Sequence, residues 1–375
     1  MKKLILLSYS YHNKIIIFKL PDPHFKMRRS IFIRNTGAAL AYMFFNPSAG
    51  GAGSPISQQL APLLKDQSGK PITSPGEWIR KREMIKRVWS EYLGIMAPNP
   101  DPPVIRIMNE DNPEELTRQY IEYESERGIR VKAYLLKPRK HEGRLPAAVA
   151  LHSTGDNQMR KIAGLETPGI ESLGYNLAKK GFIVICPMCF LWHEKGTKSY
   201  EEQVELFRSG HPQSKGMAKM LFDAMRAVDV LEQINEVDKK RIGALGHSLG
   251  AKEAFYLGAF DDRVTAVVSN EGGIGLNSTN WDDPWYLGRE IHDFPHQHHE
   301  VLGLCAPKAF LLIGGDSSDG RISEPYIDAV KPVYGLYGKP ENLMFFNHGE
   351  GHGITPEAEK ITYGWMIRHL KEKTD

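Results

Sequence analysis

The sequence predicts an α/β protein with a mostly parallel central sheet flanked by helices. Three observations support this prediction. From about residue 145 onward, short apolar runs alternate with segments whose apolar residues recur at helical spacing, as in parallel sheets. A G-x-S-x-G motif lies between one such run and a helical segment, and a loop containing two histidines precedes the last helical segment.

The elements before the parallel region have a different pattern. Residues 47–75 are rich in Gly, Pro and Ser and are typical of a linker, whereas residues 76–94 carry apolar residues at helical spacing. Two strand-like runs follow, over 119–124 and 129–137. We therefore expect three parts, namely 1–53 (export signal and upstream extension), 54–114 (linker and helical segment) and 115–375 (catalytic domain).

The parallel region is expected to contain strands over 147–151, 182–185, 242–245, 264–268, 309–313 and 343–346. The expected helices cover 170–177, 217–231, 249–257, 323–337 and 356–370. The segment 272–305 lacks clear periodicity. We expect it to be an insertion that lies over the active site.

Composition excludes several classes of function. The chain has 375 residues, a formal net charge of +3 and no long basic run, so we expect no nucleic-acid partner. The chain has three cysteines, Cys186, Cys189 and Cys305. A small and odd number of cysteines argues against a disulfide framework. Because Cys186 and Cys189 close an apolar strand, their C-x-x-C spacing does not indicate a redox motif.

The N-terminal region has the pattern of a signal peptide. Arg28 and Arg29 precede an apolar stretch over 37–45, and small residues follow over 48–53. The paired arginines resemble a twin-arginine signal that would begin at Met27, so we expect a periplasmic or extracellular protein. An ordinary N-terminal helix or disordered tail is the alternative. The apolar stretch is short for a transmembrane helix, and we expect no stable membrane insertion of the mature chain.

The G-x-S-x-G motif is formed by residues 246–250, with Ser248 at its centre. A sharp turn from a strand into a helix exposes such a serine at the edge of the sheet, close to the positive end of the helix dipole. Ser248 is therefore the candidate nucleophile. The backbone N–H of Leu249 is the first candidate oxyanion donor, and Ser153 or Thr154, after the strand at 147–151, supplies the second.

A serine nucleophile needs a general base, and the base in turn needs an acid partner. His352 is the candidate base because it lies next to the last helix, and His348 is the lesser candidate. Asp319 is the favoured acid because it follows the strand at 309–313. Glu271, after the strand at 264–268, and Asp316 remain alternatives.

Histidines and tryptophans are the further candidates for binding. His292, His296, His298 and His299 have spacings that fit no zinc motif, so we expect no metal and no cofactor. Trp192, Trp281 and Trp285 are candidate platforms for sugar rings, with packing in the core as the alternative.

Several stretches carry a family resemblance. Residues 237–250 and 221–229 resemble the dienelactone hydrolase and acetyl xylan esterase branch of the α/β-hydrolases, and the resemblance extends over about 115–372. The stretches 269–273 and 299–308 are similar to glucuronoyl esterases. The sequence departs from those esterases at Lys308 and Leu249, where they carry arginine.

The resemblance implies an α/β-hydrolase fold and a serine esterase that needs no cofactor. A small-molecule or carbohydrate ester, as for acetyl xylan esterases, is the expected substrate. The alternatives are glucuronoyl esterase or peptidase activity on the same fold, and a carbohydrate-binding pseudoenzyme.

Overall fold

The structure is a computed structural model that describes residues 60–97, 100–166, 168–192 and 199–372, together with two short strands, β1 (Ser10–Tyr11) and β2 (Lys14–Ile15). Contacts divide the chain into two units, Met1–Ser57 and Gln58–Asp375. The predicted export signal, with Arg28 and Arg29, lies outside the described residues, and β1 and β2 belong to the predicted upstream extension. Within the described part, no helix has the length and apolar character needed to span a membrane.

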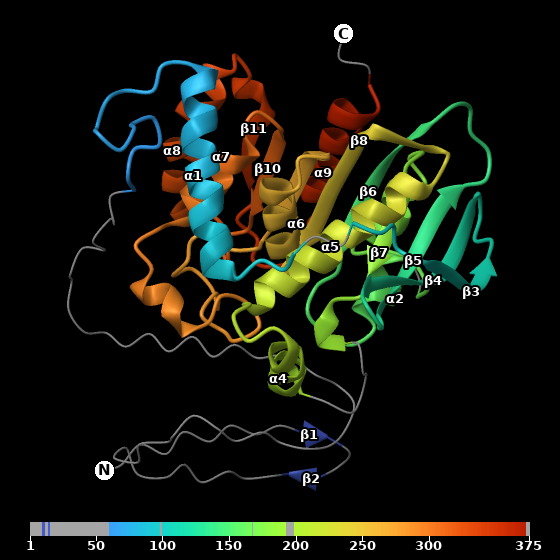
Figure 1. The fold of residues 1–375 in the computed structure, drawn as a ribbon. Helices are drawn as coiled ribbons and strands as arrows, with labels where there is room; N and C mark the ends of the chain where they lie inside the picture. Colours follow the sequence, from blue (N-terminus) through green and yellow to red (C-terminus); the bar gives the residue numbers. More distant parts are fainter. Residues whose placement is uncertain are drawn as a thin grey trace. The chain divides into compact units, whose positions relative to one another are not determined.

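The second unit is built on one nine-stranded sheet with the order β11-β10-β9-β8-β6-β7-β5-β4-β3 (Figure 1). Strands β6 to β11 pair in parallel, whereas β3, β4 and β5 add an antiparallel edge. The strands are β3 (Ile105–Asp111), β4 (Leu116–Glu126), β5 (Ile129–Pro138), β6 (Leu145–Leu151), β7 (Ile183–Pro187), β8 (Val237–His247), β9 (Val264–Asn270), β10 (Ala309–Gly314) and β11 (Leu343–Asn347). The predicted parallel sheet is confirmed.

Strand β3 was not predicted from the sequence. Its residues are largely exposed, because it is the last strand of the antiparallel edge, and its apolar residues Ile107 and Met108 are more than half exposed. It therefore lacks the alternation of apolar and polar residues that identifies a half-buried strand.

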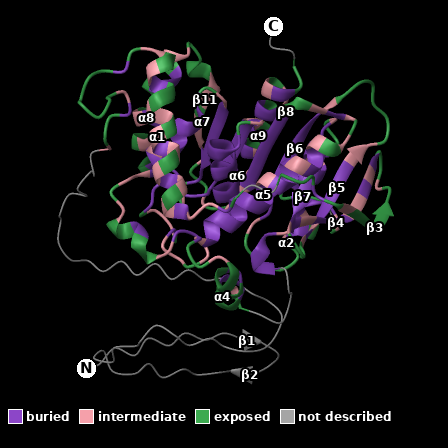
Figure 2. Ribbon diagram, in the orientation of Figure 1, coloured by how far each residue is buried: buried purple, intermediate pink, exposed green. Residues whose placement is uncertain are grey.

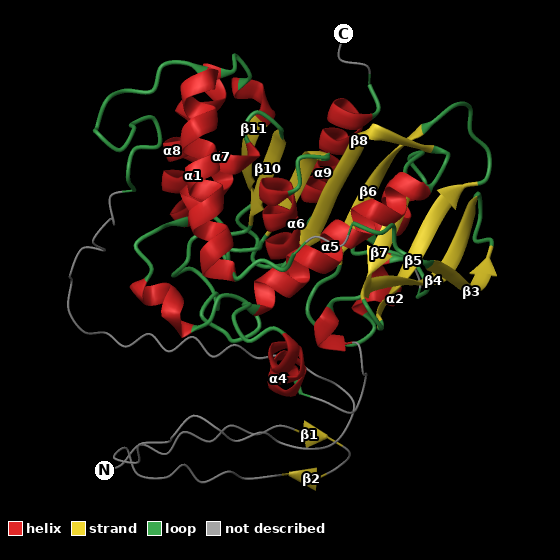
Figure 3. Ribbon diagram, viewed as in Figure 1, coloured by secondary structure: helices red, strands yellow, loops and turns green. Residues whose placement is uncertain are grey.

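Helices cover both faces of the sheet (Figure 3). The helices of the second unit are α1 (Pro75–Leu93), α2 (Gln158–Ile162), α3 (Leu173–Ala178), α4 (Tyr200–Gly210), α5 (Gly216–Gln233), α6 (Leu249–Phe260), α7 (His298–Cys305), α8 (Glu324–Leu336) and α9 (Pro356–Leu370). The core on one face includes residues of α1 and α4 to α8, and the core on the other includes residues of α2, α3 and α9. The central strands are buried between these two layers (Figure 2).

Residues 58–114 belong to the same compact unit as the rest of the sheet. Trp89 of α1 donates from Nε1 to Glu300 Oε2 at 3.0 Å, and Arg82 donates to the carbonyl of Leu304 at 3.3 Å. Strand β3 also extends the sheet. The predicted boundary at residue 114 therefore does not separate two bodies, because helix α1 buries its apolar face against α7.

The segment 272–305 is only partly the insertion that we expected. Its last eight residues form helix α7, which lies in the helix layer between α6, α1 and α8. The remainder contains the short helix η2 (Arg289–Asp293) and long loops. Trp281 within it is buried, and its Nε1 donates to the carbonyl of Gly273 at 2.6 Å.

Candidate active site

Ser248 lies at the turn between β8 and α6. Its backbone has φ 59° and ψ −117°, a conformation that side-chain-bearing residues rarely adopt. The glycines of the motif make this turn possible. A Cβ at Gly246 would lie 2.2 Å from the carbonyl oxygen of Gly250, and a Cβ at Gly250 would lie 2.1 Å from that of Leu151. The sequence thus forms a strained turn that presents the serine where β8 ends.

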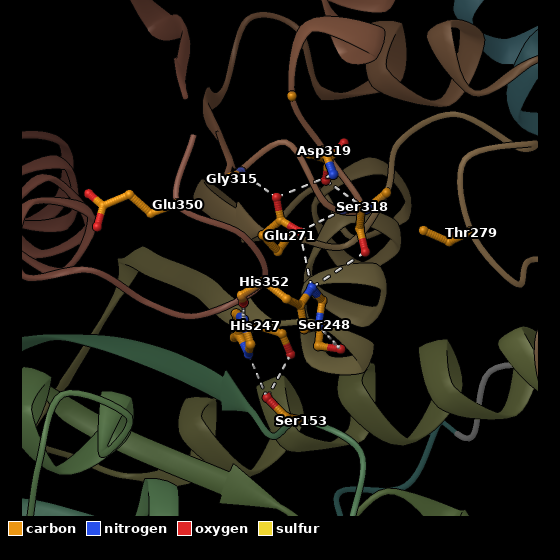
Figure 4. Close-up of polar contacts among 12 residues, drawn as sticks. Ser153, His247, Ser248, Glu271, Thr279, Gly315, Ser318, Asp319, Glu350 and His352 are labelled. Atoms are coloured by element: carbon orange, nitrogen blue, oxygen red, sulfur yellow. Dashed lines mark hydrogen bonds and ion pairs between the residues drawn. The ribbon is translucent and has the colours of Figure 1, made fainter. Parts of the chain in front are cut away.

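His352 lies in the loop between β11 and α9. Its Nε2 is 2.9 Å from Ser248 Oγ (Figure 4), within hydrogen-bond distance for a nucleophile and its base. Thr355 caps the following helix by accepting from the N–H of Ala358 at 3.1 Å, which anchors the end of this loop. The ring of His348 instead accepts from the N–H of Glu350.

The carboxylate beside His352 is Glu271. Its Oε2 is 3.0 Å from His352 Nδ1 and accepts from the N–H of Ser318 at 2.7 Å, while Oε1 accepts from the N–H of Gly315. Burial raises the pKa of Glu271, but the hydrogen bonds from His352, Ser318 and Gly315 outweigh burial and hold the pKa below its ordinary value. Glu271 is therefore ionised where it faces the imidazole.

The favoured acid, Asp319, does not contact His352, and this prediction was wrong on geometry. Its carboxylate is fully buried and accepts from the N–H groups of Gly273 and Ile274, at 2.6 and 2.8 Å, and from the hydroxyl of Ser323 at 2.7 Å. Asp319 thus fixes the position of Gly273 and Ile274, which follow Glu271 in the chain. Burial raises the pKa of Asp319.

Asp316, the third candidate, is a turn residue. Its φ is 60°, and its Oδ1 accepts from the side-chain amide of Asn347 at 2.8 Å and from the N–H of Arg321 at 3.2 Å. These bonds direct its carboxylate along the loop rather than toward the imidazole. Glu271 is thus the candidate acid that the structure places at His352.

The loops that carry the acid and the histidine are joined through their backbones. The N–H of Gly351 donates to the carbonyl of Gly315 at 2.7 Å, while Gly315 itself donates to Glu271. A Cβ at Gly315 would lie 1.8 Å from the carbonyl oxygen of Gly351. Only glycine fits between the two loops.

His247, the residue before the nucleophile, was not singled out from the sequence because the second position of the motif carries no fixed chemistry. Its Nε2 lies 2.6 Å from the backbone carbonyl of His352, and its Nδ1 lies 2.9 Å from Ser153 Oγ. Since a carbonyl only accepts, Nε2 carries the proton. Burial lowers the pKa of His247 to about 4, so the ring is neutral and Nδ1 accepts from the Ser153 hydroxyl.

The candidate oxyanion donors lie around the same turn. Leu249 is the first residue of α6, where backbone N–H groups have no acceptor within the helix. Ser153 follows β6, the neighbour of β8 in the sheet, and its contact with His247 brings it next to the nucleophile (Figure 4). Thr154 is exposed.

Comparison with known proteins agrees with this fold. Residues 131–286 match the model of the dienelactone hydrolase family. The chain has the fold of the α/β-hydrolases, and residues 131–286 are similar to the dienelactone hydrolase family. It is 28% identical over 261 residues to a Bacillus subtilis protein named as a hydrolase, YtaP, a match that covers 62% of this chain and 83% of that protein.

Two further similarities concern glucuronoyl esterases. This chain is 26% identical over 187 residues to a 4-O-methyl-glucuronoyl methylesterase of Neurospora crassa, covering 41% of this chain and 47% of that enzyme. This chain thus spans about half the length of that relative. The glucuronoyl esterase from Solibacter usitatus superposes with a TM-score of 0.67 at 18% identity, over 84% of this chain and 98% of that one.

The three tryptophans proposed as sugar platforms have different environments. Trp281 is 1% exposed and cannot stack on a sugar; the Nζ of the buried Lys252 lies 3.8 Å from its ring centroid. Burial lowers the pKa of Lys252 to about 7, and its Nζ also donates to Thr279 Oγ1 at 2.6 Å. Trp285 is partly exposed, and Trp192 lines a cavity beside the site.

The four histidines of 292–299 bind separate partners. His292 contacts Asp282, His296 contacts Glu300, His298 contacts Tyr256 and the carbonyl of Ile274, and His299 contacts the carbonyl of Ala61. Across the described ranges, no group of three or more His, Cys, Asp or Glu residues is arranged to hold a metal ion. Cys186 and Cys189 are buried free thiols, and burial raises the pKa of both.

Proposed function

We propose that this hydrolase is a serine esterase in which Ser248, His352 and Glu271 form a catalytic triad and carbohydrate esters are the substrates. The observation that carries this proposal is the chain of two contacts, 2.9 Å from Ser248 Oγ to His352 Nε2 and 3.0 Å from His352 Nδ1 to Glu271 Oε2. The serine lies at a strained turn at the edge of the sheet, as a nucleophile elbow requires.

The reaction follows from this geometry. His352 takes the proton of Ser248 as the oxygen attacks the ester carbonyl, and Glu271 stabilises the imidazolium that forms. The N–H of Leu249 and a donor at Ser153 hold the oxyanion. His352 then protonates the leaving alcohol and afterwards activates a water molecule, which hydrolyses the acyl-enzyme and frees Ser248.

Carbohydrate esters are the proposed substrate class for two reasons. The relatives in Neurospora crassa and Solibacter usitatus are named as glucuronoyl esterases, and Trp192 lines a cavity that adjoins the oxyanion loop. The position of Glu271 after β9 supports a uronate ester in particular, since Glu271 lies within the stretch 269–273, which resembles those enzymes. An acetyl ester remains the second candidate, because Leu249 stands where those enzymes carry arginine. We further propose export through the signal at 27–53.

The nucleophile is tested by Ser248→Ala. Ester hydrolysis is expected to fall by about three orders of magnitude or more, while folding is kept, because only one oxygen is lost. A fluorophosphonate probe should label the wild-type protein and not this variant. Ser209→Ala, an exposed serine of α4, is the matched control and should retain both activity and labelling. Labelling of Ser248→Ala, or no labelling of the wild type, would contradict the triad.

The substrate is tested with purified protein on three ester types. These are acetylated xylo-oligosaccharides, the methyl ester of glucuronic acid, and 4-nitrophenyl acetate as a neutral reporter. Preference for the methyl glucuronate would assign the uronate ester, and preference for the acetylated sugar would assign the acetyl ester. Cleavage of peptide amides in preference to all three would replace the esterase proposal by the peptidase alternative.

A further inference from the structure

A cavity of about 880 Å³ lies beside the proposed oxyanion loop. His152 and Gly155, on either side of Ser153 and Thr154, line it, and so does Trp192. Most of the rest of the wall comes from β3, β4, β5 and the short helix α2, which Figure 1 shows at one end of the sheet. A substrate bound at Ser248 could therefore extend into this cavity.

The floor of the cavity is one face of the antiparallel edge. Because side chains alternate between the two faces of a strand, residues two apart share a face. Tyr120 of β4 is paired with Tyr134 of β5, with ring centroids 5.0 Å apart. Arg118, two residues before Tyr120, forms an ion pair with Asp111 of β3 and donates to the carbonyls of Ala163 and Gly164. Arg118 is thus fully engaged in holding the floor.

Two other cations line the cavity without an ionic partner. Lys132 on β5 and Arg160 on α2 have no carboxylate within 4.0 Å among the residues that the structure describes. Arg160 has a hydrogen bond to the hydroxyl of Tyr134 at 3.4 Å, and Glu122 is the cross-strand neighbour of Lys132 but does not line the cavity. Since Asp111 and Arg118 neutralise each other, the residues that line the cavity carry a surplus of two positive charges, which Glu122, on the same face of β4, offsets in part.

The histidine in the wall does not add to this charge. Burial lowers the pKa of His152 to about 4, and its ring is engaged on both nitrogens, with the carbonyl of Ser153 at 2.7 Å and the N–H of Cys189 at 3.0 Å. Lys132 and Arg160 therefore remain the cations that can bind an anionic ligand in this cavity. Unpaired cations beside an aromatic pair match a ligand that has both a carboxylate and a ring face.

We infer that this cavity binds an ionised carboxylate on the sugar chain of the substrate, at a distance from the ester that Ser248 attacks. Lys132 and Arg160 would bind the carboxylate, and Tyr120 and Tyr134 would contact a sugar ring. The inference rests on the proposed function and narrows its substrate class to esters of acidic oligosaccharides. It concerns a carboxylate that is free in the substrate and not the one released by hydrolysis.

The test measures binding apart from catalysis. Calorimetry with Ser248→Ala compares a xylo-oligosaccharide carrying two glucuronate branches, one free and one as its methyl ester, with the same sugar in which both branches are methyl esters. The acidic sugar is expected to bind about tenfold more tightly, and added salt should reduce that difference because it screens the charges. In the same background, Lys132→Gln with Arg160→Gln should remove the preference.

Lys137→Gln is the matched control, because Lys137 lies on β5 five residues from Lys132, on the opposite face, and pairs with Glu236. It should keep the preference for the acidic sugar. Equal affinity for the two sugars, no binding of either, or an equal effect of Lys137→Gln would overturn the inference. If the wild type hydrolyses no ester but retains the preference, the proposed function fails and only the carboxylate-binding site in the cavity is supported. If esters are hydrolysed without the preference, only the inference fails.

Discussion

The ring of His247 donates a hydrogen bond from Nε2 to the backbone carbonyl of His352, across 2.6 Å. The residue before the proposed nucleophile thus holds the loop that carries the proposed base. Through Nδ1 the same ring holds Ser153 at 2.9 Å, so one side chain connects three segments of the site. His247 is in this sense a positioning residue.

Replacing His247 by Phe is expected to lower kcat/KM for ester hydrolysis by roughly 10- to 100-fold, the scale of a small misplacement of catalytic groups. The change removes both hydrogen bonds but keeps a ring of similar size. His247→Gln should recover part of the loss, since its amide can both donate to His352 and accept from Ser153. Wild-type activity in His247→Phe, or no recovery in His247→Gln at equal thermal stability, would contradict this role.

Glu271→Gln is expected to be far more damaging to activity than Asp319→Asn. Loss of the charge next to His352 leaves the imidazolium uncompensated and permits the wrong tautomer, which costs up to about four orders of magnitude in kcat. Asp319→Asn should mainly lower stability, by about 1–3 kcal/mol, because it weakens the acceptor for buried N–H groups of Gly273 and Ile274. Kinetics and thermal unfolding of both variants check this order. An inactive but fully stable Asp319→Asn, with an active Glu271→Gln, would contradict it.

The buried Lys252 is expected to make stability depend on pH in the alkaline range. Burial lowers its folded-state pKa from 10.5 to about 7, so between these values the unfolded chain binds the extra proton. The free energy of unfolding contributed by this group therefore rises from pH 7 to pH 10.5, by roughly 1.4 kcal/mol for each unit of pKa difference. Below pH 7 Lys252 is protonated in both the folded and the unfolded chain, so the full cost of burying its charge lowers the free energy of unfolding.

Urea unfolding at pH 7 and pH 9.5 tests this expectation. Lys252→Met should flatten the increase, whereas Lys137→Met, on the surface of β5, should keep it. An identical pH dependence in wild type and Lys252→Met would show that Lys252 does not change its protonation on folding.

Arg28→Lys with Arg29→Lys is expected to retain the protein in the cytoplasm. A twin-arginine signal depends on its arginine pair, which stands before the apolar stretch at 37–45. Cell fractionation of the full chain, probed by immunoblot, measures the outcome. Unchanged export of the double variant, with a Lys2→Arg variant as control, would contradict the twin-arginine assignment.

Much of the parallel region could be predicted from the sequence because its strands are buried on both faces. Strand β9, for example, was expected over 264–268 and covers Val264–Asn270. The elbow was recognisable because two glycines flank Ser248 between a strand and a helix. The edge strand β3 was missed because an exposed strand has no apolar periodicity.

The acid could not be chosen from the sequence. Glu271 and Asp319 follow β9 and β10, which are adjacent and parallel, so both carboxylates lie at the same edge of the sheet. Backbone N–H groups determine which of the two carboxylates contacts His352. Those of Gly273 and Ile274 engage Asp319, while those of Gly315 and Ser318 direct Glu271 toward the imidazole. Such long-range donors leave no local signal in the sequence.

The contact between Gly315 and Gly351 limits how this enzyme could be redesigned. The spacing between acid and base is set where two main chains touch, so no exchange of side chains at the triad can retune it. Mutational libraries aimed at new substrates should therefore leave the β10 and β11 loops unchanged. Diversity is better placed on the edge strand β3, whose side chains are largely exposed.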